Sequence, residues 1–136
     1  MPATPPPTRM ALLTCMDPRV DVTGILGHRA SETFVLRNGG GRVTDDVERS
    51  LALCTQVLDV TEVGVVHHTD CRLQQFSNEE LAARTGIDID FRPITSPLDA
   101  ITEDLDRLRR SPAVGRQVSI WGALYRLDIQ TVEVLP

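Results

Sequence analysis

Residues 10–14 read MALLT and lead into Cys15, and residues 63–66 read VGVV and lead into a pair of histidines. A third short run, TFVL at residues 33–36, lies between them in the sequence. Short, largely apolar runs without regular polar alternation are typical of parallel strands that are buried on both faces of a sheet. Segments of helical periodicity separate the runs, so we expect one α/β domain with a mostly parallel central sheet flanked by helices.

The clearest predicted helix follows residues 33–36. Thr44 is its expected N-cap, and Asp45 and Asp46 place negative charge in the first turn, where the helix dipole favours it. The apolar stripe of this helix comprises Val47, Leu51, Cys54 and Leu58. We therefore expect the thiol of Cys54 to lie in the core.

Two further helices and a pair of strands are predicted toward the C-terminus. Ser77, with a glutamate three residues later, predicts a capping box at a helix start. Ser96, followed by proline, predicts a helix over residues 97–110. Residues 118–134 alternate and are rich in β-branched residues, so we expect two strands joined near residues 124–126, which add an antiparallel strand at one edge of the sheet.

The chain divides into a short leading segment and one domain. Residues 1–9 contain four prolines and are expected to be flexible, whereas residues 10–136 are expected to form the domain. The leading segment lacks the apolar centre of a secretory signal, and no stretch approaches the ~20 apolar residues of a membrane span. We therefore expect a cytoplasmic protein without a membrane partner.

The charged residues exclude several classes of function. The 136 residues include 14 arginines and no lysine, and the formal net charge is -5. The absence of lysine excludes Schiff-base chemistry and phosphate-binding loops that depend on this residue. An acidic chain without clustered arginines also lacks the basic surface of a nucleic-acid-binding protein, so we expect no nucleic-acid partner.

Two motifs contain the residues that could support chemistry. The first comprises Cys15, Asp17 and Arg19, and the second comprises His68 and Cys71. Ligands bind such sheets at the carboxyl ends of the strands, so the two cysteines and the histidine meet in one crevice if their strands are neighbours. Two thiolates and an imidazole suit zinc, and three protein ligands leave a fourth position for water or substrate, as in catalytic zinc sites.

Each of these residues, taken alone, has a simpler interpretation. Cys15 and Cys71 could be buried thiols, and an odd number of cysteines argues against a disulfide framework. His68 could be a hydrogen-bonded core histidine. Asp17 and Arg19 could form a surface ion pair worth only ~0–1 kcal/mol. The two motifs together favour the metal site.

Three further residues have less defined roles. His67 is expected to point to the opposite face of the strand from His68, because side chains alternate along a strand. Asp70 is interpreted mainly as a loop residue or helix cap, with a supporting role beside the metal as the alternative. His28 cannot be placed from the sequence, so no histidine is identified as a proton shuttle.

The two motifs resemble the pattern of the β-class carbonic anhydrases, which is Cys-x-Asp-x-Arg followed later by His-x-x-Cys. The likeness extends through residues 37–41 (RNGGG), 43–46 (VTDD), 49–51 (RSL) and 67–71 (HHTDC). This resemblance implies a zinc ion held by Cys15, His68 and Cys71. It also implies reversible hydration of carbon dioxide to bicarbonate and a proton, in a homodimer or a dimer of dimers.

Roles for four further residues follow from this resemblance and from the chemistry of zinc. Asp17 is expected to orient zinc-bound hydroxide by accepting its hydrogen bond, and Arg19 to hold Asp17 through a two-pronged ion pair. The backbone N–H groups of Gly39 and Gly40 are candidates to bind a substrate oxygen. In some family members the equivalent carboxylate moves onto zinc and displaces the water.

One departure from the pattern leaves alternatives open. Arg72 follows Cys71 where the family usually has glycine, and it brings a bulky cation to the edge of the metal site. Related proteins with the same motifs hydrolyse carbonyl sulfide or carbon disulfide, which is the first alternative. The second is a non-catalytic zinc-binding scaffold in which Asp17 closes the metal coordination permanently.

Overall fold

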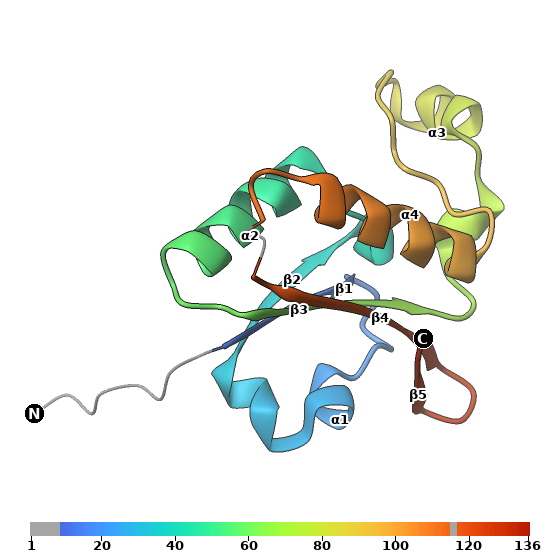
Figure 1. Cartoon of the computed structure of the whole chain (residues 1–136). Helices are drawn as coiled ribbons and strands as arrows, with labels where there is room; N and C mark the ends of the chain where they lie inside the picture. The colour runs from blue at the N-terminus through green and yellow to red at the C-terminus, as the bar shows by residue number, and fades with distance from the viewer. Residues whose placement is uncertain (1–8, 115–116) are drawn as a thin grey trace, which may run out of the picture.

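A five-stranded sheet organises the structure, a computed structural model that describes residues 9–114 and 117–136 (Figure 1). The strands are β1 (Met10–Cys15), β2 (Thr33–Asn38), β3 (Glu62–His68), β4 (Ser119–Arg126) and β5 (Thr131–Val134). Their order in the sheet is β2-β1-β3-β4-β5, and only the β4–β5 pair of this sheet is antiparallel. The predicted α/β fold with a mostly parallel sheet and an antiparallel edge strand is confirmed.

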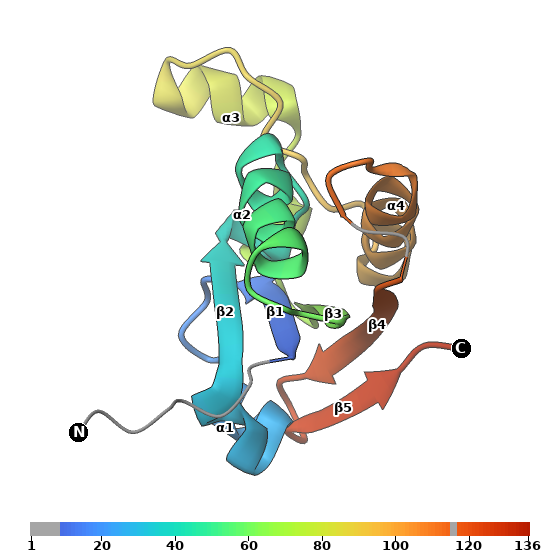
Figure 2. The ribbon, with the colours of Figure 1, turned by 60° about the vertical axis from the view of Figure 1, so that its left-hand side comes forward.

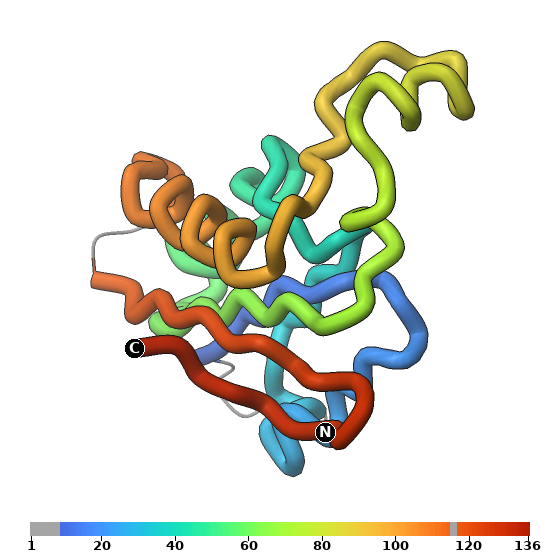
Figure 3. The backbone as a smooth tube through the Cα atoms, turned by 90° about the vertical axis from the view of Figure 1, so that its right-hand side faces the viewer, coloured from blue at the N-terminus to red at the C-terminus, as the bar shows by residue number. Residues whose placement is uncertain are grey.

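Helices cover the sheet unequally. They are α1 (Val22–Leu26), α2 (Asp45–Gln56), α3 (Asn78–Thr85) and α4 (Pro97–Arg110). The helices α2 and α4 pack on one face of the sheet, whereas α1 lies on the other face (Figure 2). The helix α3 and its flanking segments extend away from the body of the domain (Figure 3). Among residues 9–114 and 117–136, no helix combines the length and the apolar character that a membrane crossing requires.

The helix starts agree with the predicted caps. The side chain of Thr44 accepts a hydrogen bond from the N–H of Val47, and the side chain of Ser96 accepts one from the N–H of Asp99. Ser77 forms the predicted capping box at the start of α3. Local hydrogen-bonding side chains therefore fix where these three helices begin.

Two predicted boundaries are wrong. Leu58 lies beyond the end of α2 and is 44% exposed, because the N–H groups of Val57 and Leu58 both bond to the Leu53 carbonyl and the helix ends there. Residues 124–126 are not a turn but the end of β4, where they pair with β5. The turn follows at residues 127–130, and the flexible segment predicted for residues 1–9 lies, apart from Arg9, outside the described residues.

Alternation along β3 divides the core into two clusters. Val63 and Val65 pack toward α2 and α4 together with Cys54, which is buried as predicted. Val66 belongs to the cluster on the opposite face, which also contains Cys15 and Cys71. His67 and His68, the last two residues of β3, are both buried and continue this alternation.

A buried polar network connects β3 to α4 on the helix-covered face. Asp104 is completely buried and lies 2.9 Å from Arg42 Nε and 3.0 Å from an Arg92 nitrogen. His67 Nε2 lies 3.1 Å from both the Gly41 carbonyl oxygen and Asp104 Oδ2, so this nitrogen carries the proton and donates. Burial raises the pKa of Asp104, but hydrogen bonds from His67 and Arg42 lower it by more, and the carboxyl stays ionised.

Replacing the central carboxylate of this network should destabilise the fold strongly. Asp104→Ala removes the buried carboxylate to which Arg42, Arg92 and His67 all bind, which should lower the free energy of unfolding by about 3–5 kcal/mol. Asp106→Ala, on the exposed face of the same helix, is the matched control and should change it by at most about 0.5 kcal/mol. Urea denaturation measures both variants, and equal stabilities would contradict the proposed importance of the network.

Candidate metal centre

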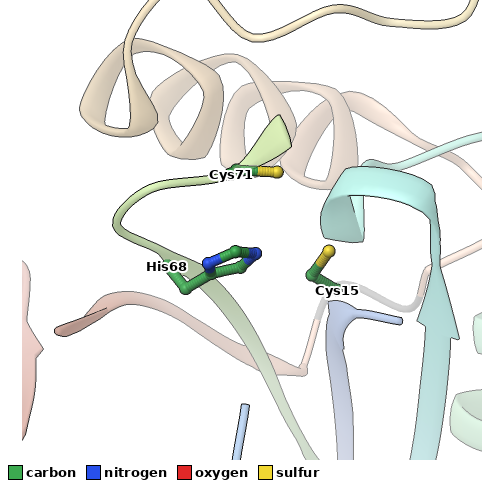
Figure 4. A group of neighbouring side chains, drawn as sticks. All are labelled: Cys15, His68 and Cys71. Atoms are coloured by element: carbon green, nitrogen blue, oxygen red, sulfur yellow. The ribbon is translucent and has the colours of Figure 1, made fainter. Parts of the chain in front are cut away.

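The two motifs meet at the carboxyl ends of β1 and β3. These strands are parallel neighbours, with Thr14 opposite Val66, so Cys15 and His68 end at the same edge of the sheet. Cys71 returns to this edge through the short loop after β3. The ligand atoms of Cys15, His68 and Cys71 all lie within 4.8 Å of one another (Figure 4). The predicted convergence of these three side chains is confirmed.

The ring of His68 is oriented for binding a cation. His68 Nδ1 lies 2.7 Å from the Thr69 carbonyl oxygen, and a carbonyl only accepts, so Nδ1 carries the proton. In the neutral ring His68 Nε2 presents a lone pair, and this buried nitrogen has no hydrogen-bond partner among the described residues. Burial lowers the pKa of His68, but the Cys15 sulfur and the Thr69 carbonyl raise it by more. A metal ion would satisfy the orphaned nitrogen.

The two cysteines share one proton between them. A hydrogen bond from the Cys71 thiol stabilises the Cys15 thiolate and lowers the pKa of Cys15 to about 4. The same interaction, together with burial, raises the pKa of Cys71. A divalent cation replaces such a proton readily, because it is attracted by both thiolates at once. The donor set of two sulfurs and one unprotonated ring nitrogen therefore fits zinc.

Asp17 and Arg19 form a close pair beside this donor set. The shortest contact, between Arg19 and Asp17 Oδ2, is 2.7 Å, and Arg19 Nε lies 3.1 and 3.2 Å from the two Asp17 oxygens. Asp17 Oδ2 is also 4.0 Å from His68 Nε2. The hydrogen bonds from Arg19 lower the pKa of Asp17 to about 2. The carboxylate is thus ionised, oriented by Arg19 and close to the ligand nitrogen of His68.

Two residues to which the sequence alone gave no definite role at the site, Asp70 and Arg37, complete this arrangement. Asp70 accepts hydrogen bonds from Arg19 through both its carboxylate and its backbone carbonyl, at 3.1 Å each. Arg37 donates to the backbone carbonyls of Cys15 and Asp17, at 2.8 and 2.7 Å. Both residues hold the loop after β1 in place. In the sequence, the position of Asp70 next to Cys71 pointed to a supporting role at this site. The role of Arg37 could be identified only from the structure, because it depends on the pairing of β2 with β1.

The glycines after β2 approach the site closely. Gly41 has a φ of +64°, and an added Cβ would lie 2.7 Å from the backbone nitrogen of Cys15. At Gly39 an added Cβ would meet only the end of Met16 at 3.8 Å, so a small side chain also fits there. The backbone N–H of Gly40 lies against the Cys15 sulfur and lowers the pKa of that thiol.

A pocket of about 550 Å³ opens beside the cysteines. The polar residues that line it are Asp17, Arg72 and the two cysteines, and Gly39 and Gly40 border it. Most of the remaining wall is apolar and consists of Met16, Pro18, Leu73, Phe76 and Leu81. His28 is exposed in the 3-10 helix Gly27–Glu32, which precedes β2 and therefore lies at the opposite edge of the sheet. His67 faces away, as predicted, so neither histidine reaches this pocket.

Comparison with known proteins gives consistent similarities. The family model described as carbonic anhydrase matches residues 10–117. The chain is 34% identical over 133 residues to β-carbonic anhydrase 1 of Mycobacterium tuberculosis, covering 93% of this chain and 80% of that protein. It is 31% identical over 150 residues to carbon disulfide hydrolase of an Acidianus species, covering 88% of this chain and 74% of that protein. The crystal structure of carbonic anhydrase from Streptococcus mutans superposes with a TM-score of 0.88 at 40% identity, covering 96% and 83% of the two chains.

Removing the side chain of Arg19 should raise the pKa of Asp17 toward its ordinary value. Because the pKa of Asp17 lies near 2 in the folded chain and near 3.8 otherwise, the pair stabilises the fold above about pH 4 and loses this effect as the pH falls toward 2. In Arg19→Ala the pKa of Asp17 should rise to 3.8 or above, since its partial burial remains. Carboxyl ¹³C NMR measures this shift. Asp90, whose pKa is lowered by Asn78 and Arg92, is the internal control; an unchanged Asp17 would refute the assignment.

Proposed function

Because the chain belongs to the β-carbonic anhydrase family, we propose that it is a zinc enzyme that converts carbon dioxide and water reversibly into bicarbonate and a proton. The observation that carries this proposal is the buried cluster of Cys15, His68 and Cys71 beside an ionised Asp17. We also propose a cytoplasmic homodimer or dimer of dimers. The volume of the pocket supports an oligomer, because a triatomic substrate fills little of about 550 Å³ and a partner chain could complete the wall.

Cys15, His68 and Cys71 would hold the zinc ion. Two thiolates balance its charge, and the lone pair of His68 Nε2 is the third donor. Zinc held in this way would act as a Lewis acid that lowers the pKa of a water molecule at the fourth position, so that a nucleophile forms near neutral pH.

Asp17 would orient that nucleophile. With a pKa of about 2, its carboxylate is ionised throughout the physiological range and can only accept hydrogen bonds. Arg19 engages both carboxylate oxygens and is in turn held by Asp70, which restricts the rotation of Asp17. This pairing supports a catalytic site over a closed scaffold, since Asp17 here binds Arg19 and leaves the three ligand atoms as a separate cluster.

The glycine segment would contribute backbone donors. We propose that the N–H of Gly39 approaches a substrate oxygen, where a donor stabilises developing negative charge. Gly40 borders the same pocket, and its N–H supports the Cys15 thiolate. The apolar wall around them accommodates a small, uncharged substrate and limits the access of water.

Hydrolysis of carbonyl sulfide or carbon disulfide is the second candidate function. The similarity to the carbon disulfide hydrolase of the Acidianus species favours it. These substrates are also linear, neutral and triatomic, and the same residues would serve the same roles. The apolar wall suits sulfur at least as well as oxygen.

The metal ligands can be tested with a matched pair of cysteine variants. The wild-type protein should contain one zinc per chain, and Cys71→Ser should lose it and unfold more easily, because metal binding and folding are coupled. Cys54→Ser removes an equally buried thiol that lies outside the cluster, and it should keep its zinc. Elemental analysis after dialysis measures both variants, and stoichiometric zinc in Cys71→Ser would overturn the assignment.

The reaction can be tested through Asp17. The wild-type protein should hydrate carbon dioxide in a stopped-flow assay with a pH indicator, and Asp17→Asn should keep its zinc and lose activity by about 100-fold, because the amide cannot orient the nucleophile in the same way. Sulfide release from carbonyl sulfide and carbon disulfide is assayed in parallel. Sulfide release with negligible hydration would replace the first candidate by the second, and inactivity in all assays at full zinc occupancy would reject both.

A further inference from the structure

Arg72 is the one charged side chain of the pocket lining without a charged partner among the described residues. It is exposed, follows Cys71 directly in the sequence and is one of the residues that line the pocket beside the metal cluster. Asp17, the other charged side chain of that wall, is paired with Arg19. No hydrogen bond or ion pair joins Arg72 to another residue in the ranges 9–114 and 117–136. Its guanidinium therefore keeps its donors for a ligand.

The surrounding charges make this cation important. Two thiolates cancel a divalent metal, and Arg19 offsets only one of the two carboxylates, Asp17 and Asp70, that it binds. Arg37, which binds the carbonyls of Cys15 and Asp17, offsets the other. Without residue 72, the metal, its ligands and these supporting residues would therefore be neutral, and Arg72 gives the site a net positive charge that attracts an anion. The apolar wall beside it weakens the screening of its field by water.

We propose that Arg72 forms an anion subsite at the mouth of the pocket, which binds bicarbonate as it forms or enters. This inference rests on the proposed function. Bicarbonate presents two oxygens in one plane, and guanidinium binds such a group through two parallel hydrogen bonds. Carbon dioxide, carbonyl sulfide and carbon disulfide are uncharged and gain little from the cation. Arg72 thus strengthens the binding of bicarbonate and not that of the neutral substrates.

A direct binding experiment tests the subsite. Sodium bicarbonate is titrated into the zinc-loaded protein at constant ionic strength, and the backbone amide NMR signals of Leu73 and Phe76, which line the pocket, report binding. Arg72→Gln should weaken the affinity for bicarbonate by about threefold to tenfold, the range expected for one partly exposed charge. Arg72→Lys keeps the charge and should bind more tightly than Arg72→Gln.

Arg49→Gln is the matched control, because it makes the same change of net charge on the exposed surface of α2. It should bind bicarbonate as the wild-type protein does. Product inhibition of carbon dioxide hydration by bicarbonate should weaken in Arg72→Gln by the same factor as binding. Equal affinities of Arg72→Gln and Arg49→Gln would overturn the subsite. If the protein proves inactive toward carbon dioxide, an NMR response that depends on residue 72 would still support it.

Discussion

Parallel pairing between β1 and β3 is the constraint on which the candidate metal centre depends. The register that places Thr14 opposite Val66 brings the carboxyl ends of both strands to one edge, where the ligand atoms of Cys15 and His68 meet. A slip of one residue would reverse the side chains of β3, so that His67 would face the cysteines. The hydrogen-bond register of the sheet, and not any chemical difference between two adjacent histidines, therefore selects the histidine that can bind a metal.

The opposite face of the sheet stabilises the same register. His67 donates to both Asp104 and the Gly41 carbonyl, and Asp104 also binds Arg42. A buried carboxylate is tolerated only when such donors surround it, so the network requires β3, α4 and the glycine segment to keep their relative positions. Because this segment borders the pocket through Gly39, residues that do not face the site contribute to its geometry.

Features that depend on local spacing were predictable from the sequence. The caps at Thr44 and Ser96 act within one helical turn, and the metal-site motifs lie where strands end. Contacts between distant residues were not predictable, because they depend on which strands are neighbours. The Arg42–Asp104 pair joins residues 62 positions apart, and Arg37 reaches the loop after β1 only through the β1–β2 pairing. The end of α2 was predicted too far along the chain, because the helical spacing of apolar residues continues past the residue at which the backbone leaves the helix.

The charges of the site are separated in space according to what each must bind. Metal binding requires negative charge deep in the crevice, where Cys15 and Cys71 lie, and a guanidinium at that depth would repel the cation. Arg72 lies outside, at an exposed position whose backbone does not have a positive φ, so arginine replaces the family glycine without backbone strain. Asp70, and not residue 72, has a left-handed backbone conformation in this loop, with a φ of +56°. The backbone at residue 72 therefore accepts side chains of different charge and size. A cation at this position can attract anions to the mouth of the pocket without weakening metal binding by Cys15 and Cys71.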